Sequence, residues 1–176
     1  GYREVSEAVR RIDAEISVVS LEPRSIEGIL NTISTVGAMA DAEDEAVGLV
    51  EILRERLGAV ENRVLERRLD GGAPRRVACL AWPDPPFAAG HWVPEQVRRA
   101  GGWELLGREG ERSIETTWDA VREVDPEQLL LIPCGFDAEA TRSEWDRTPK
   151  PAWFDELRAV REGEVLRLLA DGLSNQ

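Results

Sequence analysis

The chain has few of the residues on which most chemistry at protein sites depends. Its 176 residues include a single histidine and two cysteines, Cys79 and Cys134, which show neither zinc-ligand spacing nor a CxxC motif. It contains no nucleophile elbow, no P-loop and no GxGxxG loop. These absences predict a protein that is not an enzyme and has no metal or cofactor of its own. The cysteines are predicted to be reduced thiols, one of them in the core, and a bridge between neighbouring strand ends stays an alternative.

Long hydrophobic runs and basic clusters are also missing. No stretch of 18 apolar residues occurs, so no membrane span is predicted. No signal peptide is visible, and the compartment stays open between periplasmic or extracytoplasmic and cytoplasmic. The formal net charge of −12 argues against nucleic-acid binding, which requires clustered Lys and Arg. With 42% hydrophobic and 32% charged residues, the chain is predicted to be globular.

What is present is an alternation of segments with helical and strand periodicity. Helices are predicted over residues 2–11, 26–37, 41–68, 94–100, 117–123 and 138–145, with Ser25, Asp41 and Thr117 as N-caps. Strands are predicted over residues 16–21, 76–81, 103–106 and 129–132. The pattern predicts an α/β fold, a three-layer lobe with a mostly parallel sheet flanked by helices, preceded by a long helix. That long helix has an apolar stripe that would also suit an ordinary packed helix or a coiled-coil arm.

A segment rich in aromatic residues and proline, residues 82–95, follows the strand predicted at 76–81. Because prolines at 83, 85 and 86 restrict the backbone, the segment is predicted to lose little entropy on binding. It is interpreted as a binding loop for a large, flat, partly apolar ligand. The alternative is that Phe87 and Trp92 cap the core. A second loop, with Cys134 and Phe136, follows the strand at 129–132, and parallel strands would bring both loops to one edge of the sheet.

Three motifs resemble those of a known family. The first is residues 84–90 (DPPFAAG) with residues 100–102 (AGG); the second is residues 117–121 (TWDAV) with residues 125–127 (DPE); the third is residues 157–165 (LRAVREGEV). Their order agrees with the cobalamin- and siderophore-binding proteins of ABC importers, and the vitamin B12-binding branch is the most similar. The resemblance covers residues 18–169. It implies a substrate-binding protein that carries a corrinoid to a membrane permease.

The resemblance also implies a domain organisation. Members of this family have two α/β lobes joined by one long helix, with the ligand held between the lobes. The chain is too short for both lobes. We therefore expect residues 1–40 to be a remnant of the N-terminal lobe, residues 41–70 the helix between lobes, and residues 71–176 the C-terminal lobe of a truncated or partial protein.

Candidate site residues come from both lines of reasoning. The predicted ligand-binding residues are Trp82, Asp84, Pro86, Phe87, His91, Trp92, Cys134, Phe136 and Asp171. In the resemblance, Phe87 matches an aromatic residue that packs on the corrin, and Asp171 matches an acid near the pocket. Asp119 matches a carboxylate that docks on the permease, although it would equally suit the first turn of a helix.

The single histidine has three interpretations. His91 is a weak candidate ligand for the cobalt or iron of a bound chelate, because neutral imidazole is a common metal ligand. It could instead be a hydrogen-bonding residue of the loop, or pair with Cys134 as a nucleophile system. The favoured function is binding of cobalamin or a related corrinoid. The alternatives are a ferric siderophore or haem in the same fold, and a non-transport interaction module built on the long helix.

Overall fold

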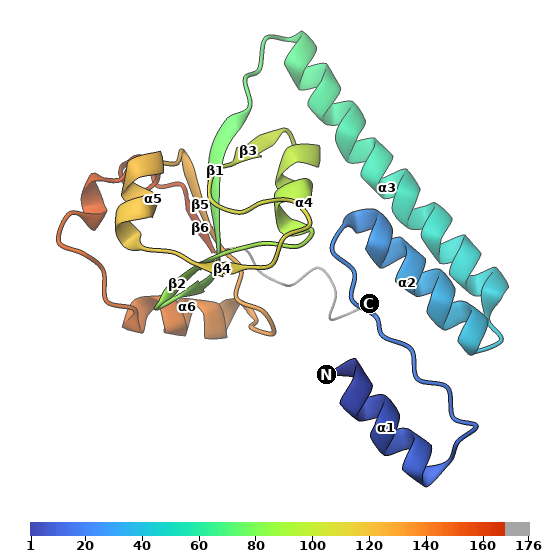
Figure 1. The fold of residues 1–176 in the computed structure, drawn as a ribbon. Helices are drawn as coiled ribbons and strands as arrows, with labels where there is room; N and C mark the ends of the chain where they lie inside the picture. The colour runs from blue at the N-terminus through green and yellow to red at the C-terminus, as the bar shows by residue number, and fades with distance from the viewer. Residues whose placement is uncertain (168–176) are drawn as a thin grey trace.

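The computed structural model describes residues 1–167, which form a helical arm, residues 1–70, and an α/β lobe, residues 71–167 (Figure 1). The arm contains α1 (Tyr2–Ile12), α2 (Ile26–Met39) and α3 (Glu43–Leu69). The lobe contains β1 (Arg75–Pro83), β2 (Pro86–Ala88), α4 (Val93–Arg99), β3 (Gly102–Glu104), β4 (Ile114–Glu115), α5 (Trp118–Val124), β5 (Gln128–Leu131), α6 (Ala138–Arg147), η1 (Phe154–Glu156), α7 (Arg158–Arg161) and β6 (Val165–Arg167).

The sheet of the lobe has the order β4-β2-β1-β5-β6, and β3 pairs with the first residues of β1. The pairs β1–β3, β1–β5 and β5–β6 are parallel, whereas β1–β2 and β2–β4 are antiparallel. The mostly parallel part of the sheet is therefore extended at one edge by a β-hairpin. This hairpin differs from the binding loop predicted over residues 82–95.

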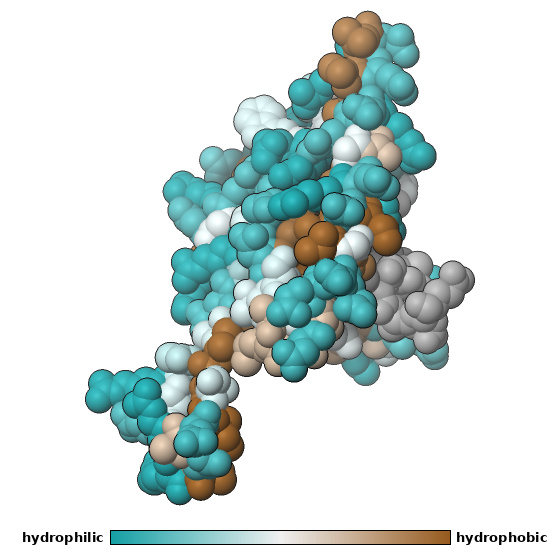
Figure 2. Space-filling view, turned by 90° about the vertical axis from the view of Figure 1, so that its right-hand side faces the viewer, coloured by the Kyte–Doolittle hydropathy of each residue, from teal (hydrophilic) through white to brown (hydrophobic). Residues whose placement is uncertain are grey.

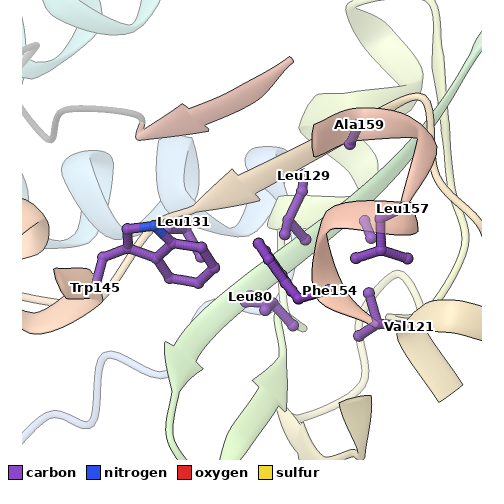
Figure 3. Close-up of a cluster of buried hydrophobic side chains, with 9 residues drawn as sticks. Leu80, Val121, Leu129, Leu131, Trp145, Phe154, Leu157 and Ala159 are labelled. Atoms are coloured by element: carbon purple, nitrogen blue, oxygen red, sulfur yellow. The ribbon is translucent and has the colours of Figure 1, made fainter. Parts of the chain in front are cut away.

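Alternate residues of β1 face two separate cores, as the pleat of a strand requires. Ala78 and Leu80 face α5, α6, η1 and α7, where Leu129 is also buried. Figure 3 shows this larger core, in which side chains from the strands meet Val121, Trp145, Phe154 and Leu157. Val77 and Cys79 face the opposite side, against Val97 of α4. Helices thus cover both faces of the sheet, and the predicted three-layer α/β lobe is confirmed.

The helical arm buries much less apolar surface. Helices α2 and α3 pack on each other, and Leu30, Ala46 and Val50 are buried there, whereas α1 stands apart in Figure 1. Figure 2 views the molecule from the side of the arm. It shows hydrophobic surface in the middle of this face and at the top of the view, where α3 ends. The exposed apolar residues of α2 and α3 are Val36, Met39, Val47, Leu49, Ile52, Val60, Leu65 and Leu69. None of the helices in residues 1–167 has the length and apolar character needed to cross a membrane.

Of the three N-cap residues predicted from the sequence, two are confirmed and one is wrong. Ser25 accepts a hydrogen bond from Gly28 N, and Thr117 accepts one from Ala120 N, so both predicted N-caps are confirmed. Asp41 is not the N-cap of α3. Its φ of 52° places it in the turn before the helix, and Ala42 takes the N-cap position without a side-chain bond.

The strand predicted over residues 16–21 is also wrong. These residues form no strand and have no ladder partners in the described chain, and Tyr2 Oη donates to Val18 O at 3.0 Å. A segment with strand periodicity becomes a strand only when a neighbouring strand pairs with its backbone. No such neighbour lies beside this segment among residues 1–167.

Candidate functional site

The first half of the aromatic segment is the hairpin of β1 and β2. Trp82 pairs with Phe87 and Pro83 with Pro86 across the ladder, and the turn between them contains exposed Asp84 and a cis Asp84–Pro85 bond. Trp82 Nε1 donates to Asp84 O at 2.9 Å, which fixes the indole against the turn. The prolines therefore stiffen a paired hairpin rather than a free loop.

The two predicted loops do converge. Strands β1 and β5 are parallel and adjacent, so their C-terminal ends lie at the same edge of the sheet. There the rings of Trp82 and Phe136 meet edge to face, with centroids 5.3 Å apart. Both side chains, and that of Phe87, are partly exposed. We call Trp82, Phe87 and Phe136 the aromatic edge, and an apolar ligand face could pack on it.

A hollow of about 500 Å³ lies where the arm meets the lobe. We call it the junction hollow. Residues 21–24 of the arm line one side, and His91, Trp92, Arg112 and Ser113 line the other. The rings of His91 and Trp92 are 5.8 Å apart and tilted by 45°. Two of the predicted site residues thus line a concave surface, together with residues that sequence reasoning did not identify.

The lobe side of the junction hollow is built by two crossing backbone segments. Gly90 N donates to Ser113 Oγ at 3.1 Å, His91 N donates to Glu111 O at 2.5 Å, and Gly110 N donates to His91 O at 2.9 Å. His91 has a φ of 54°, in the left-handed region that favours glycine. A Cβ on Gly90 would come within 2.5 Å of the backbone at residues 111–113. Close approach at Gly90 therefore positions His91 and Arg112 in the same hollow.

A polar network joins the arm to the lobe beside this hollow. The buried Glu95 accepts a hydrogen bond from Ile26 N, at the start of α2, at 2.8 Å and one from Arg99 Nε at 2.9 Å. Arg99 also pairs with Glu61 of α3 at 2.5 Å. Burial opposes ionisation of Glu95, but the hydrogen bonds from Ile26 and Arg99 outweigh it, and the pKa of Glu95 lies below its ordinary value. The network holds α2 and α3 at one position relative to α4.

A partly buried acid, Glu104, supports the sheet. The Glu104 carboxylate accepts hydrogen bonds from Cys79 N at 3.0 Å, Leu106 N at 2.8 Å and Gly107 N. Burial raises the pKa of Glu104 although these backbone donors oppose the shift. Burial, together with the nearby Glu104 carboxylate, raises the pKa of the Cys79 thiol as well. Both groups lie inside the lobe, which points to a structural role for them.

The remaining predicted residues are scattered. Cys134 is exposed and free, and Cys79 is buried and free, so the two do not form a disulfide. Pro86 is buried in the hairpin. Asp119 is exposed in the first turn of α5, and Asp171 lies outside the described residues. Within residues 1–167, no group of three or more His, Cys, Asp or Glu side chains is arranged to hold a metal ion.

Sequence reasoning missed the arm side of the hollow and the segment at residues 110–113. Arg112 and Ser113 lie in a charged, turn-like stretch with no periodicity, and only Gly110 marked the turn. Their position depends on contacts with Gly90 and His91, some twenty residues earlier in the chain. No local signal reports such a pairing.

Comparison with solved structures identifies the class of fold. The chain is 28% identical to a protein of an ABC-type Fe³⁺-hydroxamate transport system from Saccharomonospora viridis, with a TM-score of 0.67, over 89% of this chain and 52% of that one. It is 19% identical to a periplasmic haem-binding protein of Pseudomonas aeruginosa, with a TM-score of 0.73, over 96% and 60% of the two chains. It is 18% identical to the periplasmic vitamin B12-binding protein of Vibrio cholerae, with a TM-score of 0.69, over 96% of this chain and 61% of that one.

The fold is therefore that of the periplasmic substrate-binding proteins of ABC transporters. The solved structures of this fold include proteins for ferric hydroxamate, haem and vitamin B12, so the B12-binding branch is one of several that share it. The chain spans about half to three fifths of the length of these three proteins. No protein-family model matches the sequence. No curated protein matches it either.

Proposed function

We propose that this protein is the substrate-binding component of an ABC importer and that it holds a large, flat metal chelate at the aromatic edge and the junction hollow. The observation that carries the proposal is the edge-to-face contact of the Trp82 and Phe136 rings, whose centroids are 5.3 Å apart. Because of this contact, the C-terminal end of β1 lies next to the segment that follows β5. In open α/β sheets this edge collects ligands. The similarity to importer binding proteins supports binding rather than catalysis.

The aromatic edge suits a macrocycle. Trp82, Phe87 and Phe136 are partly exposed, and Trp92 lies at the junction hollow. Aromatic side chains bury a large area at a small entropic cost, so a planar corrin or porphyrin gains most of its affinity from them. A corrinoid stays the predicted ligand from the sequence motifs. Haem and a ferric siderophore are the alternatives within the same fold.

Partner and compartment are part of the proposal. Asp119 is exposed on α5, and no ion pair to it occurs within residues 1–167, so its carboxylate is available to a basic pocket of a permease. An exposed acid of this kind steers association and fixes orientation. The proposed compartment is extracytoplasmic, at the membrane through the permease. We retain the division at residues 40 and 70 as the proposed domain organisation.

The test is a titration with cyanocobalamin, haem and ferrichrome, followed by tryptophan fluorescence and calorimetry. Saturable binding of one of them, weakened about ten-fold or more in Phe87→Ala and Trp82→Ala, supports the proposal. Trp103→Ala is the matched control, because Trp103 is exposed and pairs with the opposite end of β1. Binding that Trp103→Ala weakens as much as Trp82→Ala would place the ligand elsewhere. No binding of any of the three would reject the proposal.

The exposed apolar face of the arm favours one other function, an interaction module. Ile52 is 55% exposed on α3, whereas Leu53 and Leu57 on the same helix are half-buried. A lysine at Ile52 should therefore disturb the packing of α3 less than a lysine at Leu53 or Leu57, so Ile52→Lys is the variant that tests self-association. Light scattering that shows a dimer for the wild type and a monomer for Ile52→Lys, without binding of any chelate, would favour the interaction module.

A further inference from the structure

The two walls of the junction hollow are carried by the starts of two helices. On the arm side, residues 21–24 lead directly into Ser25, the N-cap of α2. On the lobe side, Trp92 lines the hollow and is itself the N-cap residue of α4. The shape of the hollow therefore depends on how the first turn of α2 is held against the first turn of α4.

A buried carboxylate joins these two helix starts, which lie side by side in Figure 1. Glu95 is in the first turn of α4, and its Oε2 accepts a hydrogen bond from Ile26 N at 2.8 Å. Ile26 is the first residue of α2, so its N–H has no acceptor within its own helix. Glu95 comes three residues after Trp92, and Ile26 comes two residues after Arg24. The bond thus connects the two walls of the hollow within a few residues of each.

Within residues 1–167, the arm shares no buried hydrophobic cluster with the lobe. An apolar contact occurs near the end of α3, where a Cβ on Gly101 would come within 2.8 Å of Val64. A further connection is polar: Arg99 donates to the second oxygen of Glu95 at 2.9 Å and pairs with Glu61 of α3 at 2.5 Å. We call Glu95, Arg99 and the bonds that they make to the arm the clasp.

We infer that Glu95 is a positioning residue for the ligand of the proposed importer. Its bond to Ile26 N holds residues 21–24 opposite Trp92, so that the junction hollow has its binding shape only while the clasp is closed. This inference rests on the proposed function, because that function assigns the hollow to the ligand. A carboxylate suits this role, since it binds the N–H groups at the positive end of a helix dipole more strongly than a neutral acceptor does.

The first measurement uses the wild-type protein. A ligand that touches both walls and a clasp that holds them stabilise each other, because the coupling between two sites is reciprocal. The start of α2 reports the clasp, since Glu95 is the acceptor that protects the Ile26 amide. We expect saturation with whichever of cyanocobalamin, haem and ferrichrome binds to slow hydrogen exchange there about five-fold or more. Mass spectrometry of a peptide that covers residues 21–30 measures the rate.

Variants assign the effect to the clasp. Glu95→Gln keeps the size of the side chain, but one of its two oxygens becomes an N–H₂ group, which cannot accept from Arg99 or from Ile26 N. We expect it to speed exchange at residues 21–30 about five-fold or more and to weaken chelate binding by a similar factor. Arg99→Gln keeps the bond to Ile26 N and breaks the connection to α3, so its effect on both readouts should be smaller.

Two control variants separate positioning from general stability. Arg98→Gln removes an arginine of the same helix whose partner, Glu109, lies within the lobe, and it should leave both readouts nearly unchanged. Val121→Ala makes a cavity in the larger core and should lower the free energy of unfolding without changing chelate affinity well below the unfolding temperature. Circular dichroism at the temperature of the titration confirms that each variant is folded.

The outcomes separate the positioning role from the proposed function. Faster exchange in Glu95→Gln together with unchanged chelate affinity would overturn the positioning role and leave the importer proposal standing on the aromatic edge. Exchange at the start of α2 that neither the bound chelate nor Glu95→Gln alters would overturn the positioning role as well. If none of the three chelates binds the wild type, the proposed function fails, and the assignment of Glu95 to ligand positioning fails with it.

Discussion

The arm and the lobe of this protein are folded by different forces. In the lobe, Leu80, Leu129 and Leu131 are almost completely buried, and the sheet joins segments up to about ninety residues apart. In the arm, the helices follow local rules: Ser25 caps α2, and three acids open α3. Their apolar residues remain largely exposed, as with Ile12 at 81% and Leu69 at 78%. Local signals can therefore define helices without defining a large core, whereas the sheet and core of the lobe depend on long-range contacts.

The largest expected contrast is between buried and exposed leucines. Leu80→Ala removes a fully buried side chain from the larger core and should lower the free energy of unfolding by about 2–5 kcal/mol. Leu65→Ala, at a position that is 57% exposed on α3, should change it by less than about 0.5 kcal/mol. Urea denaturation followed by circular dichroism measures both. Equal costs at the two positions would show that the arm has a core of its own.

Glycine substitutions should have opposite signs in the two regions. A Cβ at Gly90 meets backbone atoms at 2.5 Å, so Gly90→Ala should destabilise the lobe by about 1–3 kcal/mol and displace the 110–113 segment. Gly58 lies within α3 with nothing within 4 Å of an added Cβ. Gly58→Ala should stabilise the protein by about 0.5–1 kcal/mol. Thermal unfolding of the two variants checks the signs, and a neutral Gly90→Ala would contradict the close approach.

The connection between arm and lobe can be weakened at Glu95. Glu95→Gln removes the charge that accepts hydrogen bonds from Ile26 N and Arg99, and it should cost about 1–3 kcal/mol at neutral pH. Because folding lowers the pKa of Glu95, its contribution is complete above its ordinary pKa of 4.5 and is lost as the pH falls through the lower folded value. The difference between wild type and variant should shrink in that acidic range.

Equilibrium unfolding at pH 7 and at pH 3 measures this difference. Glu123→Gln, at an exposed position on α5, is the control for the loss of one carboxylate. A constant difference between wild type and Glu95→Gln at the two pH values would mean that ionisation of Glu95 does not hold the arm.

A smaller effect on stability is expected at Asp119. Asp119→Lys should lower the free energy of unfolding by about 0.5–1 kcal/mol, because the exposed side chain has no ion pair within the described chain but lies in the first turn of α5, where an acid is favoured over a cation. It should leave chelate binding unchanged but reduce uptake through the permease, if the carboxylate docks there. Glu123→Lys, on the same helix, is the control for charge alone. Unchanged uptake with Asp119→Lys would remove the docking role.

The sequence was sufficient for what depends on local pattern and composition. It predicted helices α1 to α6 but not α7. It also predicted the buried strands at residues 76–81 and 129–132, the caps at Ser25 and Thr117, and the convergence of the loops that contain Trp82 and Phe136. The sequence was not sufficient where the structure depends on pairing between segments that are distant along the chain. Residues 16–21 have strand periodicity but no partner strand within the described chain, and Phe87 lies in a hairpin strand although prolines occupy positions 83, 85 and 86. Arg112 reached the hollow through contacts with Gly90 that no short-range signal records.

The contrast between the two cysteines has a practical consequence for labelling. Cys134 is exposed two residues before Phe136, whereas Cys79 is buried and its raised pKa keeps it in the unreactive thiol form. A maleimide dye should therefore attach at Cys134 alone, without any substitution in the chain. The dye would lie beside the aromatic edge, where its emission would report the arrival of a coloured ligand directly.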